Sequence, residues 1–420
     1  MFRFLHAADL HIDSPLTGLS AYESAPVEQV RGATRRALEN LVALAIEQQV
    51  AFVLLSGDIY DGDWKDYRTG LFFRGQLARL EQAGVRVALI AGNHDAASQI
   101  SRDLSLPGNV MRFGSTTPTT KILEDYAVAL HGQGFATRAV TEDLAASYPE
   151  PLPGMLNIGL LHTALDGRAG HGTYAPTSIT VLAGKMYDYW ALGHVHNREV
   201  VSTAPWIVWP GNTQGRNARE TGPKGCSLVC VEDAKITSVA HHDLDVVRWA
   251  ALQVDLDGAV SAHDMLDRVD SALRKASDEA DGRVVCARIQ VQGAAACHDA
   301  IAGKPEHWKQ EIRALCQSIN GGDVWVEKVR FDTNSLRSAG EIAARSESIA
   351  AFLGEGSDPM ASEDIPAVKE VLEAFRHALT GEVTEGPDGF DPNDETTLTR
   401  LMAEARALLA SRFGGAGTAP

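Results

Sequence analysis

The chain has 420 residues, 45% of them hydrophobic and 22% charged, a composition typical of a globular protein with two or three domains of roughly 100–200 residues each. Its 38 basic and 55 acidic side chains give a net charge of −17, which argues against a protein that coats nucleic acid through its overall charge. No apolar run reaches the roughly 18 residues that span a bilayer, so we expect no membrane partner. The residues before Asp9 have neither the length nor the flanks expected of a signal peptide, and the 5 cysteines form no CxxC pair. We therefore expect a reducing, cytoplasmic location.

Residues 1–245 alternate short apolar runs with helical patterns, and this alternation is typical of an α/β layered fold. Strands are expected at residues 2–6, 51–55, 85–90, 156–161 and 187–192, and helices at 27–48 and 67–83. Between about residues 200 and 243 the chain becomes rich in short strands. We therefore expect a single α/β domain over residues 1–245.

Two further regions follow this domain. Residues 249–333 have the pattern strand, helix, strand, helix, strand, which predicts a small two-layer α+β domain. Residues 336–413 carry apolar side chains at helical spacing, and three helices are expected, at 338–352, 362–379 and 394–413. Residues 414–420 are expected to form a flexible tail.

Potential metal ligands follow the predicted strands of the first domain. They are Asp9 and His11, then Asp58 and Asp61, then Asn93, His94 and Asp95, then His162, and finally His194 and His196. Because loops leave the carboxyl ends of strands into one shared crevice, we expect these side chains to converge. Carboxylate and amide oxygens mixed with imidazole nitrogens suit two divalent transition ions better than calcium or a structural zinc. Each motif alone would more often be a strand-end turn, but five in order favour a metal site.

The ordered set DxH, GDxxD, GNHD, H and GHxH resembles the calcineurin-like metallophosphoesterase superfamily. Within it, HAADLHIDSP, GDIYD, LLHT and GHVH resemble the SbcD-type nucleases of DNA-break repair, and WPGNTQGRNARETGPKGC is most similar to the bacterial YhaO-like exonuclease branch. The resemblance is specific over residues 1–245 and rests on architecture alone beyond them. Gly62 and Asp63 stand where protein phosphatases of the superfamily carry Arg-Gly, which disfavours a phosphoprotein phosphatase. Many nuclease relatives have histidine where this chain has Asp61, so the resemblance assigns Asp61 no role.

The resemblance implies a four-layer β-sandwich flanked by helices, with two divalent metal ions at its site. One ion would be held by Asp9, His11, Asp58 and His196, and the other by Asp58, Asn93, His162 and His194. Manganese is the expected metal, with Mg²⁺, Fe²⁺ or Zn²⁺ as alternatives. In this scheme a bridging hydroxide attacks phosphorus and His94 assists the leaving group. Asp95 either orients His94 or caps a turn.

A glycine-rich loop near the expected site carries Arg216, Arg219 and Lys224. Cations in such a loop can bind the phosphate backbone of a substrate, and a solvated loop is the ordinary alternative. We expect Arg216 and Arg219 to contact the substrate.

Together these features predict a two-metal-dependent DNA phosphodiesterase, an exonuclease or endonuclease of DNA repair. The resemblance assigns residues 249–333 to a capping domain that holds DNA over the site, and residues 336–413 to docking an SMC-like ATPase; it also allows a homodimer. The main alternative is a small-molecule phosphodiesterase or phosphatase, which the acidic balance favours. A non-catalytic scaffold for the ATPase is a third hypothesis, and His94 disfavours it because a purely structural metal site needs no such residue.

Overall fold

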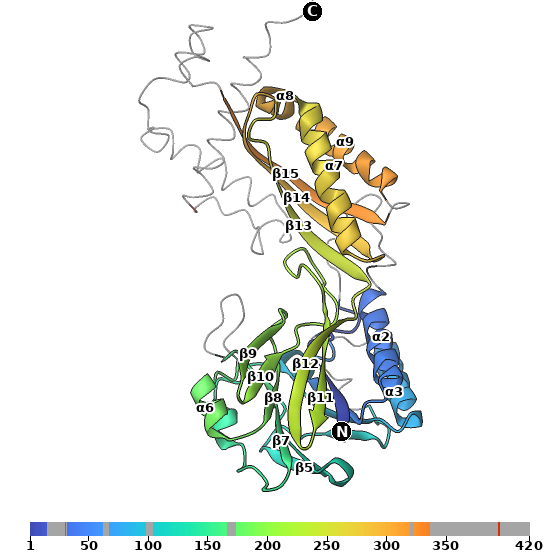
Figure 1. Ribbon diagram of the computed structural model, residues 1–420, viewed down its shortest axis with the longest axis vertical. Helices are drawn as coiled ribbons and strands as arrows, with labels where there is room; N and C mark the ends of the chain where they lie inside the picture. Colours follow the sequence, from blue (N-terminus) through green and yellow to red (C-terminus); the bar gives the residue numbers. More distant parts are fainter. Residues whose placement is uncertain are drawn as a thin grey trace, which may run out of the picture. The chain divides into compact units, whose positions relative to one another are not determined.

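The computed structural model describes residues 1–14, 30, 32–61, 67–97, 104–165, 174–319, 323–336 and 394. By compactness the chain divides into two units (Figure 1). The first comprises residues 1–251, 275–288 and 320–327, and the second comprises residues 252–274, 289–319 and the chain from residue 328 onward. Apart from residues 336 and 394, the predicted C-terminal helices and tail lie outside the described residues.

The first unit contains two six-stranded sheets. The first sheet has the order β12 (Lys235–Asp243), β11 (Gly225–Glu232), β1 (Phe2–Ala7), β2 (Phe52–Ser56), β3 (Arg86–Ile90) and β4 (Val110–Arg112). The second has the order β5 (Thr119–Leu123), β6 (Val128–Gly132), β7 (Leu156–His162), β8 (Tyr189–Gly193), β10 (Trp206–Trp209) and β9 (Glu199–Thr203). Neighbours in the sheets are often distant in sequence, so crossover connections build both sheets.

The strands that carry the predicted ligands run parallel within each sheet. β1 pairs with β2, β2 with β3 and β3 with β4 in parallel, and β6, β7, β8 and β10 form a second parallel group. Antiparallel pairs complete the sheets, namely β11 with β1 and β12, β5 with β6, and β9 with β10. Because parallel strands end on the same side, each sheet gathers its strand-end residues in one place.

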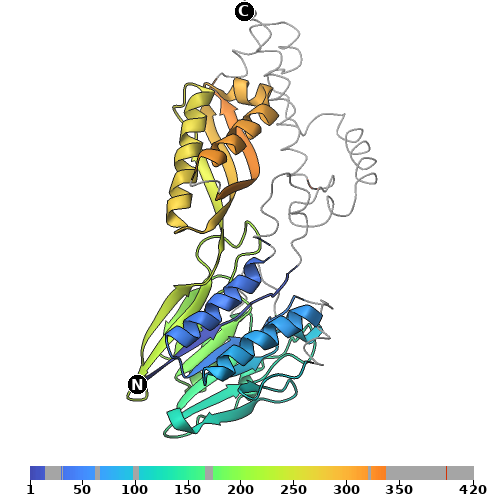
Figure 2. The same ribbon diagram turned by 90° about the vertical axis from the view of Figure 1, so that its right-hand side faces the viewer.

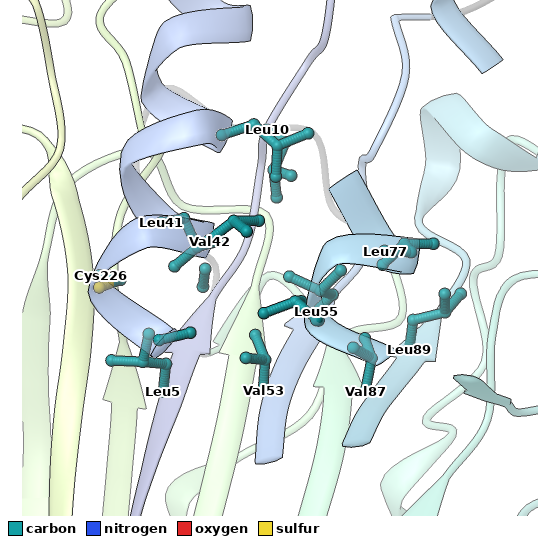
Figure 3. Close-up of a cluster of buried hydrophobic side chains, with 14 of the residues drawn as sticks. Leu5, Leu10, Leu41, Val42, Val53, Leu55, Leu77, Val87, Leu89 and Cys226 are labelled. Carbon is teal, nitrogen blue, oxygen red and sulfur yellow. The ribbon is translucent and has the colours of Figure 1, made fainter. Parts of the chain in front are cut away.

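Alternate side chains of the first sheet enter two different cores, because successive residues of a strand point to opposite faces. Leu5 of β1 and Val53 of β2 pack toward α2 (Ala33–Glu47) and α3 (Tyr67–Gln82), which cover one face of the sheet (Figure 2). Figure 3 shows Leu41 of α2 pointing into this cluster. Buried residues of α2 recur three and four positions apart, the spacing that places one face of a helix on a sheet.

A second core lies between the two sheets, where Phe4 of the first sheet and Ile158 of the second share one buried cluster. A third cluster covers the other face of the second sheet. There Trp190 donates from Nε1 to the carbonyl of Leu182, in α6 (Ile179–Gly184), at 3.0 Å. Helices, sheet, sheet and helix therefore form the predicted layered α/β sandwich, which is confirmed.

A third sheet follows the two sheets of the first unit and contains three strands. Its strands, in spatial order, are β13 (Val247–Asp255), β14 (Val284–Ala295) and β15 (Val324–Ser335). Between β13 and β14 the chain forms α7 (Ala262–Glu279), and between β14 and β15 it forms α8 (His298–Gly303) and α9 (Pro305–Leu315). This is the order of elements that the sequence predicts for 249–333. The remaining helices of the described chain are short: α4 (Asn93–Ala97), η2 (Glu124–Tyr126), η3 (Ala145–Ser147) and η5 (Cys316–Ser318). No helix in the described residues is both long and apolar enough to cross a bilayer.

The three-stranded sheet begins inside the first unit. Trp249 of β13, Cys286 of β14 and Trp325 of β15 are buried in one cluster with Ala33 and Ala218. This shared cluster is the physical reason that the beginnings of β14 and β15 group with the first unit. The sequence predicts that a second domain begins at residue 249, which lies within β13, and the two compact units interleave along the chain from there.

Leu54 lies between the two sheets and is fully buried. Leu54→Ala should lower the free energy of unfolding by about 2–5 kcal/mol, because it removes buried methyl groups and leaves a cavity. The matched control is Leu71→Ala in α3, where the side chain is 59% exposed; the expected change is below about 0.5 kcal/mol. Urea denaturation followed by circular dichroism checks both variants, and equal losses would contradict the burial of Leu54.

Candidate metal centre

The predicted ligands lie at the carboxyl ends of strands from both sheets. In chain order, Asp9 and His11 follow β1, Asp58 follows β2, Asn93 begins α4 after β3, His162 ends β7, and His194 and His196 follow β8. Asp9, His11, Asp58 and His162 are each at most 1% exposed. The two sheets therefore deliver carboxylates and imidazoles to one buried place.

Four of these positions hold the backbone in the left-handed region, which residues other than glycine rarely adopt. The φ angle is 53° at Asp9, 42° at His11, 52° at Asp58 and 98° at His194. Hydrogen bonds from the Asp9 N–H to the Gly57 carbonyl (3.0 Å) and from the His11 N–H to the Asp58 carbonyl (3.1 Å) keep the loops in this shape. Such conformations cost of the order of 1–3 kcal/mol each, so their concentration here indicates loops held in place by the surrounding fold.

Two glycines of the motifs stand where neighbouring loops approach too closely to leave room for a side chain. Gly57 has a φ angle of 93°, and a Cβ atom there would lie 2.5 Å from Nδ1 of His162. A Cβ atom at Gly92 would collide with the Asp58 carboxylate. These glycines allow the loops after β2 and β3 to lie against each other and against the end of β7.

Asp9, His11 and His196 form a first group of candidate ligands, with one ligand atom from each lying within 4.8 Å of the others. Nε2 of His11 lies 3.3 Å from Nε2 of His196, which lies 3.9 Å from Oδ1 of Asp9. The other ring nitrogen of His196, Nδ1, lies 2.8 Å from Oε1 of Glu220. Burial lowers the pKa of His11 to about 3, so its ring is neutral and able to coordinate a metal.

Asp9, Asp58 and His162 form a second group with the same spacing. Nε2 of His162 lies 3.4 Å from Oδ2 of Asp58 and 2.9 Å from Oδ1 of Asn93. Nδ1 of His162 donates to the Ser56 carbonyl at 2.9 Å, which leaves Nε2 facing the group. Burial by itself would lower the pKa of His162, but the neighbouring Asp58 carboxylate raises it to about 9. The acids therefore favour a positive charge at Nε2, and a divalent cation can supply that charge in place of a proton.

The two groups form one centre. They share Asp9, and Asp58 links them because its Oδ2 also lies 3.8 Å from Nε2 of His11. Carboxylates, imidazoles and an amide oxygen brought together in a buried place are the donors that divalent transition ions prefer. The residues present thus fit a pair of such ions.

His194 is the predicted ligand whose ring lies outside the groups that the described residues form. Its ring centroid is 5.2 Å from that of His162 and 5.6 Å from that of Tyr174. Its backbone N–H lies 3.0 and 3.1 Å from the two carboxylate oxygens of Asp9. The structure therefore places His194 beside the second group, where its backbone also orients an acid common to both groups.

His94, predicted to act on the substrate without binding metal, has 27% of its side chain exposed. Its Nδ1 lies 2.8 Å from Oδ1 of Asp61, and its backbone N–H donates to Oδ1 of Asp58 at 2.9 Å. His94 also forms a third group with His11 and Asp58, with ligand atoms within 4.8 Å. Burial lowers the pKa of His94, but the Asp61 and Asp58 carboxylates outweigh burial and raise it. A protonated His94 ring can donate to an oxygen of a phosphoester.

Of the two roles predicted for Asp95, the contacts of its carboxylate match the cap. The Asp95 carboxylate accepts hydrogen bonds from backbone N–H groups in two loops, those of Ile59 after β2 and Gly92 after β3, each at 3.0 Å. Successive residues of a helix point about 100° apart, so His94 and Asp95 of α4 face different surroundings. Asp61 takes the place beside His94, and Asp95 has the capping role that was its alternative.

The loop between β10 and β11 gives its three cations different positions. Arg216 has 16% of its side chain exposed, and its Nη1 lies 3.7 Å from Oδ2 of Asp61, at the rim of the centre. Arg219 is exposed to solvent. Lys224 is 3% exposed and donates from Nζ to the carbonyl of His196 at 2.9 Å. Lys224 therefore supports the backbone of a candidate ligand and is too buried to receive a phosphate.

Glu220 is a residue of the centre that the sequence does not reveal. Its Oε1 lies 2.8 Å from Nδ1 of His196 and 2.8 Å from Nη2 of Arg216. The four-residue spacing from Arg216 is a signal for an ion pair. Nothing in the sequence connects Glu220 with His196, 24 residues away.

Comparison with known proteins agrees with this geometry. Residues 2–198 match the calcineurin-like phosphoesterase family, and residues 249–334 match the middle domain of metallophosphoesterase YhaO. The uncharacterized metallophosphoesterase YhaO of Bacillus subtilis is 34% identical over 296 residues, covering 70% of this chain and 72% of that protein. The chain belongs to the calcineurin-like metallophosphoesterases. Its similarity to YhaO places this metallophosphoesterase in the YhaO-like branch, and the resemblance found in the sequence is confirmed.

More distant relatives of this metallophosphoesterase are archaeal proteins named DNA double-strand break repair protein Mre11. The one from Haloferax volcanii is 24% identical over 262 residues, covering 61% of this chain and 56% of that protein. The one from Sulfurisphaera tokodaii is 24% identical over 204 residues, covering 47% of this chain and 50% of that protein. The chain spans about half the length of these two relatives.

Family membership and geometry agree on the class of chemistry. Calcineurin-like phosphoesterases use divalent metal ions, and the described part of this metallophosphoesterase gathers three groups of side chains that could hold a metal ion at the ends of its strands. The protein is therefore a metal-binding hydrolase of phosphoesters.

The different positions of Asp61 and Asp95 predict that mutation of Asp61 lowers activity and mutation of Asp95 lowers stability. Asp61→Asn should lower hydrolysis of bis-p-nitrophenyl phosphate by about 10²-fold at full metal content, because His94 loses the carboxylate that raises its pKa. Asp95→Asn should lower the free energy of unfolding by about 1–3 kcal/mol, because the amide NH₂ would face buried backbone donors. Kinetics, metal analysis and thermal unfolding separate the two effects. Full activity of Asp61→Asn would contradict the pairing with His94.

Proposed function

We propose that this metallophosphoesterase hydrolyses phosphodiester bonds of DNA with two divalent ions, Mn²⁺ being the preferred metal. The observation that carries the proposal is the pair of ligand groups joined through Asp9 and Asp58, beside a His94 ring paired with Asp61. When bound, two divalent ions would stabilise the attacking and leaving oxygens of an in-line displacement. A donor set of oxygen and nitrogen without sulfur is compatible with Mn²⁺.

The side chains around the ligands have separate tasks in this proposal. Asp61 holds Nδ1 of His94, so Nε2 is the atom from which a proton passes to the leaving oxygen. Arg216 is partly exposed, with Nη1 3.7 Å from Asp61, and its charge can offset that of a non-bridging phosphate oxygen. Arg219, exposed in the same loop, is proposed to bind a neighbouring phosphate of the backbone.

DNA is proposed as the substrate because of the relatives and the size of the chain. Two relatives are named DNA double-strand break repair proteins, and a small phosphodiester would not need a second unit to hold it. The net charge of −17 favours the other candidate, a small-molecule phosphodiesterase, since it disfavours DNA over most of the surface. The two candidates differ in whether polymeric DNA is cleaved.

The remaining parts of the proposal concern partners and location. An SMC-like ATPase is proposed to bind the segment 336–413, nearly all of which lies outside the described residues. A homodimer and a cytoplasmic location remain predictions as well. All 5 cysteines are described and free, which is compatible with a reducing compartment.

A digestion assay tests the substrate and the metal together. The wild-type protein should degrade end-labelled duplex or single-stranded DNA when Mn²⁺ is added. Asp58→Asn should reduce cleavage of DNA and of bis-p-nitrophenyl phosphate to background, because it removes the charge that links the two ligand groups. Asp233→Asn, an exposed aspartate before β12, is the matched control. Cleavage of bis-p-nitrophenyl phosphate without cleavage of either DNA would favour the small-molecule phosphodiesterase.

The salt dependence of DNA binding tests the loop between β10 and β11. Arg219→Ala should weaken binding for every DNA sequence and reduce the slope of log K against log salt by about 0.9, the value for one lost phosphate contact on duplex DNA. Hydrolysis of bis-p-nitrophenyl phosphate should not change. Arg74→Ala, an exposed arginine of α3, is the control. A slope equal to that of the control would remove Arg219 from the DNA-binding surface.

A further inference from the structure

Glu220 is buried in the loop between β10 and β11, and nitrogen atoms of three residues surround its carboxylate. Oε1 lies 2.8 Å from Nδ1 of His196 and 2.8 Å from Nη2 of Arg216. Oε2 accepts from Nδ2 of Asn212 at 2.9 Å and from the backbone N–H of Arg216 at 2.8 Å. Arg216 and Asn212 present N–H donors to both oxygens, so this pocket favours the charged carboxylate over a protonated carboxyl. Glu220 is therefore an ionised carboxylate that can only accept.

The contact with Glu220 decides which nitrogen of His196 can bind a metal. A neutral imidazole carries one proton, and the nitrogen without the proton is the one that coordinates. Because the carboxylate only accepts, it places the proton of His196 on Nδ1 and the lone pair on Nε2. Nε2 is the atom that lies 3.3 Å from Nε2 of His11 and 3.9 Å from Oδ1 of Asp9. Glu220 thus directs the coordinating atom into the first ligand group.

Arg216 cannot take over this task. Its Nη2 lies 3.2 Å from Nδ1 of His196, and a guanidinium only donates. Without the carboxylate, this donor would favour an Nδ1 that accepts a hydrogen bond. The proton of His196 would then move to Nε2, and the ring would present an N–H to the metal centre.

We infer that Glu220 is a positioning residue that fixes the tautomer and the orientation of His196 for metal binding. The inference rests on the ligand role of His196 in the proposed function, and it is independent of the substrate. Carboxylate partners of metal-binding histidines typically change metal affinity by about 10–100-fold. The residue acts through His196 and does not touch the phosphoester.

Calorimetric titration of the metal-free protein with Mn²⁺ tests the inference. Glu220→Gln should weaken one of the two Mn²⁺ sites by about 10–100-fold and leave the other nearly unchanged, because only the first ligand group contains His196. Glu232→Gln, at an exposed position at the end of β11, is the matched control and should bind Mn²⁺ like the wild type.

The variant His196→Ala separates a failure of this inference from a failure of the proposed function. If His196→Ala weakens one site and Glu220→Gln does not, Glu220 is not a positioning residue, and the ligand assignment of the proposed function stands. If neither variant changes either affinity, His196 is not a ligand, and the inference falls together with that part of the proposed function.

A spectroscopic measurement decides the question even if Glu220→Gln does not fold. Ring ¹⁵N spectra of histidine-labelled, metal-free wild-type protein in mildly alkaline solution report the tautomer directly, and the signal missing from His196→Ala identifies the residue. We expect a proton on Nδ1 of His196. A proton on Nε2 in the wild type would overturn the inference.

Discussion

The carboxylate of Asp58 is the interaction on which the rest of the centre depends. One of its oxygens accepts from the backbone N–H of His94, and the other lies 3.4 Å from Nε2 of His162 and 3.8 Å from Nε2 of His11. These partners come from the ends of β1, β3 and β7, so a single side chain connects the two sheets. The left-handed backbone at Asp58 and the absence of a side chain at Gly92 both serve to bring this carboxylate into place.

The centre concentrates acids away from water. Asp9 and Asp58 are each 1% exposed, and burial is the main reason that the pKa of Asp9 is raised. Keeping several ionised carboxylates together away from water is costly unless positive charge compensates them. Divalent ions would supply that charge, so we expect metal binding and stability of the strand-end loops to be coupled. The rigid sheets below the loops are what allow the folded chain to tolerate such a site.

The ligand set could be predicted because its signal is local. Each ligand follows an apolar strand, and parallel strands bring their ends together whatever the details of packing. The layered α/β fold follows from the same alternation of strands and helices. The strands predicted at 2–6, 51–55, 85–90, 156–161 and 187–192 differ from the observed ones by one or two residues at their ends. The short β4 has partly exposed residues and β5 mostly exposed ones, so their patterns are too weak to be found.

Contacts between residues from different loops could not be predicted. Asp95 is adjacent to His94 in sequence, which suggested a pairing, yet the helical turn separates the two side chains and Asp61 reaches His94 from the loop after β2. Glu220 meets His196 only because the loop before β11 returns to the end of β8. The interleaving of the two compact units could not be predicted either, because the buried cluster of Trp249 and Trp325 forms only through tertiary packing. A single sequence carries no direct information on such pairs.

The position of β11 has a consequence for where this protein can be divided. The calcineurin-like match ends at residue 198, but β11 pairs antiparallel with β1, the strand that leads to Asp9 and His11. A fragment ending at the family boundary would leave β1 as an open sheet edge with unpaired N–H and C=O groups, which invites edge-to-edge aggregation. It would also lack the loop whose Lys224 donates to the His196 carbonyl. The smallest piece of this chain that can fold around its site therefore extends through β11, well beyond the stretch by which the family is recognised.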